Sequence, residues 1–446
     1  MKNINLSNNK FCIDSRDIRK NSIFVCLKGK KTNGHNFVRQ NIKKNCKFII
    51  NKKFKLGKKF NIYKKKLIRT NSPLKTLTLL ARLKRKKLKG ILLGITGSCG
   101  KTTVKEMLYF FLSSYSTTYK SPKSFNNKIG LPLSILNQPA NSSYNFYELG
   151  MNKLGEIDFL SKILKPYIGI ITNIAPAHIG PLKSLKNIFK AKSEIIKNIE
   201  KFGYIILNAD CKYFNELKKV AKKNKIKIVS FGIHNNADIK FKKIIKNRCY
   251  IEENNKIINF DVKDKSEIFI SNILIVFSVL NILKLNKKKM LKKISKFSNI
   301  KGRGNIVKIK IKKKKIAIID DSYNSNPHSV KQSINRFSTL NITRYKNKYI
   351  FLGDMLELGN LSYKFHCDLA KYINQTSVKK VYCVGTKTKL TFKNLKFEKR
   401  GIYFPNITSL DKSLDDLFVD NAIYLFKGSN GTGLNKILSK RIYNVK

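Results

Sequence analysis

The sequence has no tryptophan and few acidic residues: 26 Asp and Glu stand against 93 Lys and Arg in 446 residues, a formal net charge of +67. Such an excess normally points to nucleic acid or an anionic membrane as partner. Only 12 of the basic residues are arginine, the better phosphate ligand, and the lysines are spread along the chain. Abundant Lys, Asn and Ile share AT-rich codons, so genome bias explains the charge and we expect no specific nucleic acid partner. A selected interaction with polyanions is the alternative.

Three further features are missing. The eight cysteines form no C-x-x-C pair, which favours reduced thiols in a cytoplasmic protein over disulfides or a metal site. The N-terminal segment MKNINLSNNKFCIDSR has no apolar core of a secretory signal. The longest uncharged apolar run, Ile268 to Leu283, is shorter than the roughly 20 residues of a spanning helix. It predicts a buried helix, no membrane span and a cytoplasmic protein.

The apolar runs predict an α/β protein of three domains, in keeping with about 150 residues per domain. Residues 1–86 form a small α/β unit with strands in SIFVCLKG and CKFIINKK and a helix from Leu74 to Lys89. Residues 87–304 form a central domain with a mostly parallel sheet and a lysine-rich β excursion from Asp238 to Asp264. Residues 305–446 form a doubly wound, Rossmann-like domain with strands in KKIAIIDDSY, KYIFLGDM, KKVYCVGT and AIYLFKGS.

The strongest local motif is a phosphate-binding loop. The strand-like GILLGIT is followed by GSCG and then by the helical KTTVKEMLYFFLSS, as in a P-loop βα unit. Backbone N–H groups of such a loop bind phosphate oxygens, its lysine reaches the terminal phosphates, and a Thr hydroxyl can bind Mg²⁺. The spacing is irregular, because Ile95 stands at the first glycine position and Gly94 comes one residue early. The predicted nucleotide-binding residues are Gly97, Ser98, Cys99, Gly100, Lys101, Thr102 and Thr103.

Three residues beyond the loop are candidates for the same site. Glu148 ends the strand in YELG, where a carboxylate could hold Mg²⁺. His178 follows the next strand in NIAPAHIG, and Lys192 lies in the helical segment AKSEII. Each residue alone has an ordinary explanation as a solvated strand end, a structural histidine or one of many lysines.

Together and in this order, the motifs resemble the Mur ligase family, the ATP-dependent amide-forming ligases of peptidoglycan synthesis. The resemblance spans about residues 14 to 430, through DSRDIRKNSIFVCLKG, GITGSCGKTTVKEM, SFNNKIGLPLSIL, ELGMNKLGEI, AHIG, AKSEII, GRG, DDSYNSNPHSV, FLGDMLELG with His366, and FKGS. The segments FNNKIGLP, DDSYNSNP and GDMLELG resemble the member that adds D-alanyl-D-alanine. A sibling ligase that adds another amino acid, or a decayed ligase scaffold that binds polyanions, is the alternative.

The resemblance implies a reaction and a division of labour. The N-terminal domain would hold the UDP-sugar end of the substrate, the central domain ATP, and the C-terminal domain the dipeptide. ATP would phosphorylate the terminal carboxylate of a UDP-N-acetylmuramoyl-tripeptide, and the amine of D-alanyl-D-alanine would attack the acyl phosphate. Such chemistry depends on neutralising charge and aligning the reactants, without a protein nucleophile. We expect a monomer that acts on these small molecules.

The resemblance also implies the roles of individual residues. The catalytic residues would be Lys101, Glu148, His178 and Lys192. Two Mg²⁺ ions would be held by Thr102, Glu148, His178 and a carbamylated Lys192, which would be an oxygen ligand on a long arm. Further ATP contacts would be Asn272, Arg303, Asp321, Tyr323 and Asn324, and substrate contacts Ser15, Arg16, Asn126, Asn127, Lys427 and Ser429. For the asparagines, ordinary turn chemistry is an equally good explanation.

Three positions depart from the family pattern. Gly180 stands where the family usually has Glu, Ile275 where a second Asn is expected, and Asn430 where an Arg is usual. These departures weaken a carboxylate role at position 180, the adenine contact of Asn272 and a cation that would anchor the dipeptide carboxylate. We expect them to lower efficiency or stability more than to change the reaction.

Overall fold

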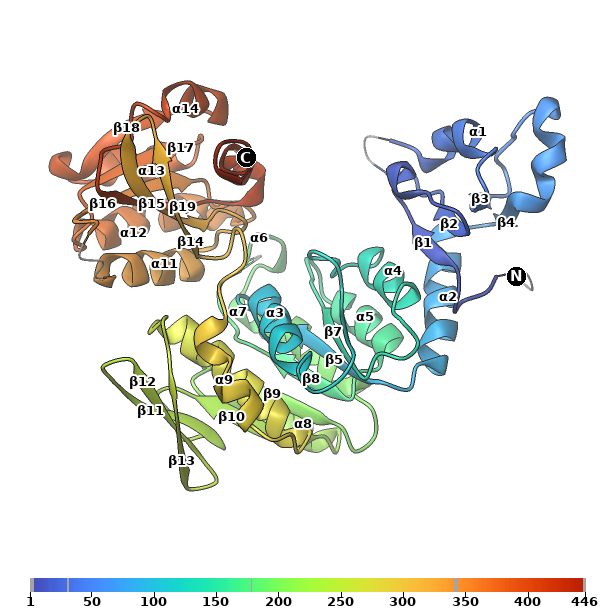
Figure 1. Cartoon of the computed structure of the whole chain (residues 1–446), viewed down its shortest axis with the longest axis horizontal. Helices are drawn as coiled ribbons and strands as arrows, with labels where there is room; N and C mark the ends of the chain where they lie inside the picture. Colours follow the sequence, from blue (N-terminus) through green and yellow to red (C-terminus); the bar gives the residue numbers. More distant parts are fainter. Residues whose placement is uncertain (1–3, 30–31, 178, 341–343, 444–446) are drawn as a thin grey trace.

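The structure is a computed structural model that describes residues 4–29, 32–177, 179–340 and 344–443. Within these residues the chain forms three units, each built on its own sheet. In Figure 1 the central unit forms the base, and the N-terminal and C-terminal units rise from it as two separate arms. Mixed helices and mostly parallel strands confirm the predicted α/β class. The exact domain boundaries, after residues 86 and 304, stay predictions.

The N-terminal unit has, in its described part, a four-stranded parallel sheet in the order β1-β2-β3-β4. Phe24 on β2 and Phe48 on β3 meet edge to face and are buried in the hydrophobic core of this unit. The elements are β1 (Lys10–Cys12), η1 (Ser15–Asp17), β2 (Ser22–Val25), η2 (Gly34–Phe37), α1 (Val38–Asn41), β3 (Lys47–Asn51), η3 (Lys58–Lys66) and β4 (Leu67–Thr70).

The helix α2 (Pro73–Lys87) follows the N-terminal sheet and confirms the predicted helix, with ends shifted by one or two residues. It begins cleanly because Ser72 accepts a hydrogen bond from the Lys75 N–H and proline occupies the first turn. Leu77 and Leu80 are buried in a core shared with the central unit, so the helix ties the two units together.

The central unit carries a nine-stranded sheet within the described residues, ordered β13-β12-β11-β10-β9-β8-β5-β7-β6. Its strands are parallel from β6 to β11, and β12 and β13 are added antiparallel at the β11 edge. The β excursion predicted between residues 238 and 264 is thus formed by β11, β12 and β13. The strands are β5 (Ile91–Thr96), β6 (Thr118–Lys120), β7 (Tyr144–Glu148), β8 (Ile168–Ile171), β9 (Tyr204–Asn208), β10 (Lys227–Gly232), β11 (Ile239–Ile245), β12 (Arg248–Glu253) and β13 (Lys256–Asp261).

In the sheet, strand β5 lies between β7 on one side and β8 on the other, and both of these strands come later in the chain. The chain therefore reverses direction across the sheet at β5, and the carboxyl ends of these strands leave a crevice where ligands bind in open α/β sheets. The helices that cover the sheet are α3 (Lys101–Leu112), α4 (Gly130–Leu136), α5 (Glu156–Leu164), α6 (Ile179–Leu182), α7 (Leu185–Ser193), η4 (Glu194–Asn198), α8 (Phe214–Lys223), α9 (Glu267–Ile282), α10 (Lys288–Leu291) and η5 (Ile294–Lys296).

Helix α9 is the apolar run that the sequence predicted as a buried helix. Ser266 caps it, accepting a hydrogen bond from the Phe269 N–H, and most of its side chains are buried against the central sheet. Among the described residues, no helix combines the length and apolar character needed to cross a membrane.

The C-terminal unit has six strands in its described part, in the order β14-β15-β19-β16-β17-β18. All pairs are parallel except β14 with β15, and helices separate the parallel strands. The elements are β14 (Asn305–Ile311), β15 (Lys314–Asp321), α11 (Pro327–Thr339), β16 (Asn347–Gly353), η6 (Gly359–Leu361), α12 (Ser362–Asn374), β17 (Lys380–Val384), α13 (Thr388–Asn394), η7 (Phe397–Lys399), β18 (Arg400–Phe404), α14 (Ile407–Ser413), β19 (Ala422–Lys427), η8 (Asn430–Thr432), α15 (Leu434–Leu438) and η9 (Ser439–Tyr443).

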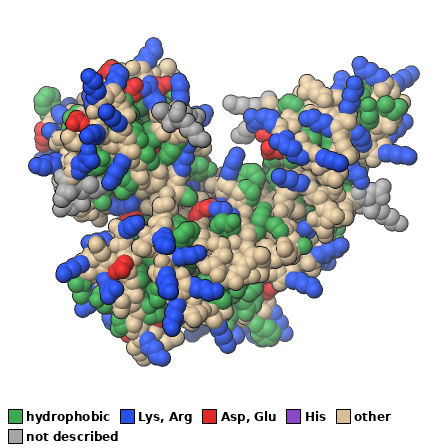
Figure 2. All heavy atoms as spheres, viewed as in Figure 1, with side chains coloured by type: hydrophobic (Ala, Val, Ile, Leu, Met, Phe, Trp, Pro, Cys, Tyr) green, Lys and Arg blue, Asp and Glu red, His purple; other side chains and the backbone are tan. Residues whose placement is uncertain are grey.

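The four strands predicted here are β15, β16, β17 and β19, whereas β14 and β18 were not anticipated. Strand β14 alternates half-buried and exposed residues on the sheet edge, so it lacks a continuous apolar run. Figure 2 shows Lys and Arg side chains over all three units of the visible face, without a single concentrated patch.

Candidate active site

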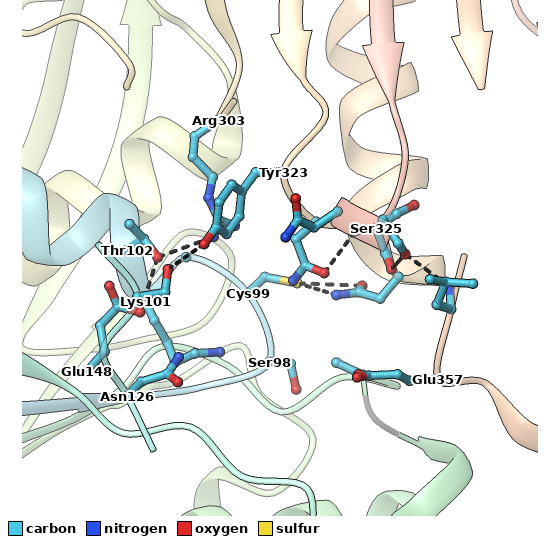
Figure 3. Close-up of a pocket in the computed structure, with 18 of the residues that line it drawn as sticks. Ser98, Cys99, Lys101, Thr102, Asn126, Glu148, Arg303, Tyr323, Ser325 and Glu357 are labelled. Atoms are coloured by element: carbon cyan, nitrogen blue, oxygen red, sulfur yellow. Dashed lines mark hydrogen bonds between the residues drawn. The ribbon is translucent and has the colours of Figure 1, made fainter. Parts of the chain in front are cut away.

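The phosphate loop opens into a cavity of about 270 Å³ between the central and C-terminal units (Figure 3). From the central side it is lined by Ser98, Cys99, Gly100, Lys101, Thr102, Ser124, Asn126, Glu148 and Ala177. From the other side it is lined by Arg303, Tyr323, Asn324, Ser325, Asn326, Leu356, Glu357, Ser429, Asn430 and Gly431. The lining is mostly polar and comes from two units, as suits a site where a charged nucleotide meets a second substrate.

The loop is held to the segment that follows β8. Ser98 Oγ donates to the Ala175 carbonyl at 2.7 Å and accepts from the Ala175 N–H at 2.9 Å. The Cys99 N–H donates to Asn173 Oδ1 at 2.9 Å, and Thr172 Oγ1 donates to the Cys99 carbonyl at 2.5 Å. These bonds fix the loop before any ligand arrives, so little ordering is needed on binding.

Gly97 is required by the close approach of this loop to β8. Its φ is +149°, and a Cβ at this position would lie 1.9 Å from Thr172 Oγ1. Any side chain here would push the loop away from the strand end, so a residue other than glycine is excluded.

Lys101 lies at the start of α3, and its Nζ donates to the Gly97 carbonyl at 2.7 Å. Burial lowers the pKa of Lys101, and the charge of Glu148 partly opposes this effect. An anionic phosphate beside the ammonium group would favour its charged form. Lys101 therefore lies at the position where the motif predicts a phosphate contact.

Thr102 and Glu148 meet beneath the loop, where Thr102 Oγ1 donates to Glu148 Oε2 at 3.1 Å. The other carboxylate oxygen, Oε1, lies 3.0 Å from Nζ of Lys105 in an ion pair without hydrogen-bond geometry. Lys105 Nζ also donates to the Ser121 and Lys123 carbonyls. A hydroxyl and a carboxylate side by side at a phosphate loop are oxygen donors of the kind that Mg²⁺ prefers.

Lys192 is buried at the end of α7, close enough to Lys101 and Cys99 for their charges to act on it. Burial, and then the positive charge of Lys101, hold the pKa of Lys192 well below its usual value. An ammonium ion is costly in such surroundings, so the side chain is favoured as a neutral amine. A neutral amine is a nucleophile, whereas an ammonium ion is not.

A second cavity, of about 330 Å³, continues from Cys99 and Gly100 toward α9. Asn272 lines it, and its buried Nδ2 has no hydrogen-bond partner within the described chain. Buried amide groups are nearly always paired, so this donor fits a ligand that brings an acceptor. This placement is consistent with the prediction that Asn272 faces the nucleotide. Ile275, where the family pattern would have a second Asn, is instead buried in the hydrophobic core.

Two further segments reach the loop: the connection between the central and C-terminal units, which carries Arg303, and the residues between β15 and α11. The Arg303 guanidinium stacks on the Tyr323 ring, 4.5 Å from its centre, and donates to Thr102 Oγ1 at 3.3 Å. The Tyr323 hydroxyl donates to Ser124 Oγ at 3.3 Å. Asn326 caps α11 and donates through Nδ2 to Cys99 Sγ at 3.3 Å. These contacts bring C-terminal groups to the phosphate loop.

Asp321 and Lys427, predicted to contact ATP and substrate, pair with each other at 2.9 Å. Lys427 also donates to the Asn324 carbonyl at 2.7 Å, and it is buried. Both line a smaller cavity that also includes Arg303 and Asn324. Lys427 thus has partners within its own unit, which makes it a weaker candidate for a free anchoring cation, while Ser429 lines the main cavity as expected.

Other predicted residues lie elsewhere. Ser15 and Arg16 are on η1 of the N-terminal unit and are not among the residues that line the main cavity. Hydrogen bonds from Arg16 lower the pKa of Asp14 to about 2, an exposed local pair. Asn127 Oδ1 accepts the Ile129 and Gly130 N–H groups in the turn before α4, which is the turn chemistry of the alternative explanation. His178 lies outside the described residues.

Several residues of the site carried no predicted role, and four of them bear most directly on its geometry. They are Lys105, which pairs with Glu148; Asn173, which holds the loop; Asn326, which contacts Cys99; and Glu357 on the C-terminal side. Lys105 lies in the same segment as Lys101, KTTVKEM, so its position in the motif was a usable signal. The other three reach the site only through tertiary contacts.

Comparison with known proteins gives consistent matches along the chain. Residues 95–284 match the Mur ligase middle domain, and residues 302–430 match the domain described as "Mur ligase, glutamate ligase domain". The UDP-N-acetylmuramoyl-tripeptide–D-alanyl-D-alanine ligase of Rickettsia prowazekii is 32% identical over 98% of this chain and 96% of its own length. The ligase of the same name from Borreliella burgdorferi is also 32% identical, over 98% and 95%.

Comparison with solved structures agrees with these sequence matches. A crystal structure of MurF from Acinetobacter baumannii matches with a TM-score of 0.81 at 25% identity, covering 97% of this chain and 92% of that chain. The MurF ligase from Thermotoga maritima, solved in complex with ADP, matches with a TM-score of 0.82 at 24% identity, covering 98% and 97%. The second likeness concerns the fold, which extends across all three units.

Proposed function

This chain belongs to the Mur ligase family, and we propose that it is an ATP-dependent ligase that joins D-alanyl-D-alanine to a UDP-N-acetylmuramoyl-tripeptide, forming ADP and phosphate. The observation that carries this proposal is the cavity in which the phosphate loop faces groups from the C-terminal unit. A nucleotide on the loop would present its terminal phosphate to a carboxylate and an amine held between two units. That is the arrangement that acyl phosphate formation and aminolysis require.

ATP binding falls to the loop and its surroundings. The backbone from Gly97 to Gly100 and the start of α3 face the phosphates, and Lys101 adds a cation. Arg303 brings a second cation from the segment between the units. We assign the end of the nucleotide that lies beyond the phosphates to the cavity beside Asn272, whose unpaired amide calls for an acceptor.

The residues present fit Mg²⁺. Thr102 and Glu148 offer a hydroxyl and a carboxylate next to the phosphate loop, and these two side chains would hold the ion. When bound, the metal ion supplies positive charge that neutralises the β- and γ-phosphates. Lys105 fixes the Glu148 carboxylate in place through their ion pair, so the ligand does not have to be ordered on binding. The second predicted metal ligand set includes His178, which lies outside the described residues.

Carbamylation of Lys192 is also part of the proposal. Its buried position favours the neutral amine, which can attack CO₂ to give a carbamate and a proton. The product replaces a neutral amine, which has no oxygen to offer Mg²⁺, with an anion that can bind it. Near Lys101, the negative carbamate would also be better tolerated than a second ammonium ion.

In the reaction, this chain binds, orients and neutralises. Lys101 and Arg303 offset the charge that otherwise repels a substrate carboxylate from the γ-phosphate. The carboxylate attacks the γ-phosphorus and ADP leaves; the amine then attacks the acyl carbon and phosphate leaves. The C-terminal loops that line the cavity would shield the acyl phosphate from water.

The remaining assignments follow from the substrates. We propose that residues 1–86 hold the UDP-sugar, with Ser15 and Arg16 as contacts, and that Asn126 faces the muramyl peptide. ATP and a UDP-linked precursor are cytoplasmic metabolites, so we place the enzyme in the cytoplasm. We further propose that it acts as a monomer.

The test is ADP release by the purified protein with Mg²⁺, ATP, UDP-N-acetylmuramoyl-tripeptide and D-alanyl-D-alanine, with each omitted in turn. Turnover that needs every component supports the proposal, and turnover with another amino acid in place of the dipeptide overturns the substrate assignment. Lys192→Ala should abolish turnover. In CO₂-depleted buffer the wild-type rate should fall and return on addition of bicarbonate, whereas a rate indifferent to bicarbonate contradicts the carbamate.

A further inference from the structure

Arg303 lies between two glycines, and the backbone on both sides of it is bound to Asp320. The Gly302 N–H donates to Asp320 Oδ2 at 3.0 Å, and the Gly304 N–H donates to the Asp320 carbonyl at 2.7 Å. The Gly302 carbonyl in turn accepts the Tyr323 N–H at 3.2 Å. The short segment that carries Arg303 is therefore fixed to the end of β15.

The Asp320 side chain is buried, and the groups around it are hydrogen-bond donors. Its Oδ1 accepts the Ser322 N–H at 3.2 Å and the Ser322 hydroxyl at 2.6 Å. Its Oδ2 accepts the Tyr443 hydroxyl at 3.0 Å, in addition to the Gly302 N–H. Burying a carboxylate is costly unless its oxygens are hydrogen-bonded, and here both oxygens are engaged. The carboxylate is thus a fixed point for the segment that it binds.

Asn305 sets the direction of the hydrogen bonds that reach Asp320. Its Oδ1 accepts the Gly302 N–H at 3.2 Å, so its Nδ2 donates to the Tyr443 hydroxyl at 2.7 Å. The Tyr443 oxygen accepts that bond, and its proton is therefore directed at Asp320. The ammonium group of Lys301 lies 3.6 Å from the centre of the Tyr443 ring and holds the ring against the same segment.

The anchors of this segment belong to the C-terminal unit, whereas the group that Arg303 reaches belongs to the central unit. Asp320 lies on β15 and Tyr443 on η9. The Arg303 guanidinium stacks on the Tyr323 ring and donates to Thr102 Oγ1 at the phosphate loop, and Figure 3 shows Arg303 and Tyr323 side by side next to Thr102. Arg303 is thus a cation that the C-terminal unit presents to the phosphate site.

We propose that Asp320, with Tyr443 as its outer partner, is a positioning residue for the ligase reaction that aims Arg303 at the terminal phosphate of the nucleotide. The inference rests on the proposed function, in which Arg303 offsets negative charge while the acyl phosphate forms. Without the anchor, Arg303 keeps its charge but loses its place, and a displacement of about 1 Å can slow a reaction by about 100-fold. Asp320 is not among the residues that line the main cavity, so its effect on the reaction passes through Arg303.

The experiment measures the first half of the reaction alone, by omitting the dipeptide and trapping the acyl phosphate with hydroxylamine as a hydroxamate. In Asp320→Asn the amide oxygen can accept on one side only, so the donors on the other side lose their acceptor. Tyr443→Phe removes only the outer hydrogen bond. Tyr424→Phe, which removes a buried hydroxyl that accepts the Val419 N–H elsewhere in the same unit, is the matched control. Asp320→Asn and Tyr443→Phe are each also combined with Arg303→Met.

We expect Asp320→Asn to slow hydroxamate formation by about 10- to 100-fold, the effect of a misplaced charge. Tyr443→Phe should slow it by about 3- to 10-fold, the effect of one lost hydrogen bond, and Tyr424→Phe should change it by less than about twofold. The dipeptide KM of the full reaction should not rise in any of them. In the Arg303→Met background, Asp320→Asn and Tyr443→Phe should have no further effect, because the group that they position is gone.

A further loss by the same factor in the Arg303→Met background overturns the inference, because it would show that Asp320 acts independently of Arg303. An unchanged hydroxamate rate in either single variant also overturns it. If Asp320→Asn does not fold, Tyr443→Phe decides by the same two criteria. A wild-type protein that forms no hydroxamate with the UDP-substrate would instead reject the proposed function.

Discussion

The ammonium group of Lys105 lies 3.0 Å from Oε1 of Glu148, and both side chains are almost completely buried. The pair lies directly beneath the phosphate loop, with Thr102 on the other oxygen of the carboxylate. Burying a charged side chain without a partner is costly, so the two side chains stabilise each other at this depth. Lys105 thus holds in place the carboxylate that we propose as a metal ligand.

Replacing Lys105 with Met should destabilise the protein by about 3–5 kcal/mol, because it leaves the Glu148 carboxylate buried and unpaired. Guanidinium-induced unfolding measures the change. Adding Glu148→Gln should recover much of this stability in the double variant but no ligase activity. As a control, Lys162→Met removes the partly exposed pair with Asp158 and should cost no more than about 0.5 kcal/mol. Equal losses in both variants would contradict the special role of the buried pair.

The stability of the protein should depend on pH through Lys192. Burial and the charge of Lys101 lower the pKa of Lys192 in the folded state, so the unfolded chain binds more protons between the lowered pKa and the usual value of about 10.4. The free energy of unfolding should therefore rise with pH across that window in CO₂-free buffer. Lys192→Met should flatten this rise, and a variant that keeps the wild-type slope would show that another group is responsible.

Nucleotide should protect Cys99 from alkylation. Cys99 is partly exposed in the phosphate loop, and Cys367 is a partly exposed thiol on α12, far from the loop in sequence and not part of the cavity lining. At a hundred times the Kd of Mg-ATP, labelling of Cys99 by iodoacetamide should slow by up to about 100-fold. Cys367 should label at an unchanged rate, as followed by peptide mass spectrometry. Equal protection of both thiols would indicate a general tightening of the protein.

The buried thiols should resist the same reagent. Burial raises the pKa of Cys12, Cys26 and Cys249 to about 12, so almost no thiolate is present at neutral pH. We expect these three to be labelled only after unfolding in denaturant. Labelling of any of them in the folded protein at a rate close to that of Cys367 would contradict this expectation.

Gly180→Ala should destabilise the contact between the central and C-terminal units. The new Cβ would meet the Gly359 nitrogen and the Glu357 carbonyl, so the loop must move away from α6. Overpacking of this kind costs about 1–3 kcal/mol of folding free energy, which guanidinium-induced unfolding measures. A variant that unfolds at the same denaturant concentration as the wild type would contradict this close contact.

The net charge should speed the association of the anionic substrates. With a formal net charge of +67, the protein attracts ATP and the UDP-linked substrate over distances that salt screens. Raising the salt concentration from about 0.05 M to about 0.5 M should increase the KM for both of them. The KM for D-alanyl-D-alanine, a zwitterion without net charge, should change far less. If all three respond equally, salt acts on the protein's conformation.

Local sequence was sufficient for the phosphate loop and for much of the architecture. The order of strand, glycine turn and helix around Lys101 depends on residues close together in the chain, so it can be recognised without tertiary information. The buried parallel strands could also be recognised locally, because each is a continuous apolar run. Helix α9 was evident from the length of its apolar run. The edge strand β14 was missed because its alternating, lysine-rich sequence has no continuous apolar run. It becomes a strand by pairing with β15, a contact that its own residues do not reveal.

Tertiary structure alone decided which polar groups share the site. It paired Asp321 with Lys427, which the sequence treated as separate ligand contacts, and it brought Glu357 across from the phosphate loop. Gly180, which in sequence was only a departure from a family pattern, became the point at which two units touch. These relationships join residues more than a hundred positions apart, and they depend on how the units pack. Packing sums many weak contacts across the whole chain, so no local motif records it.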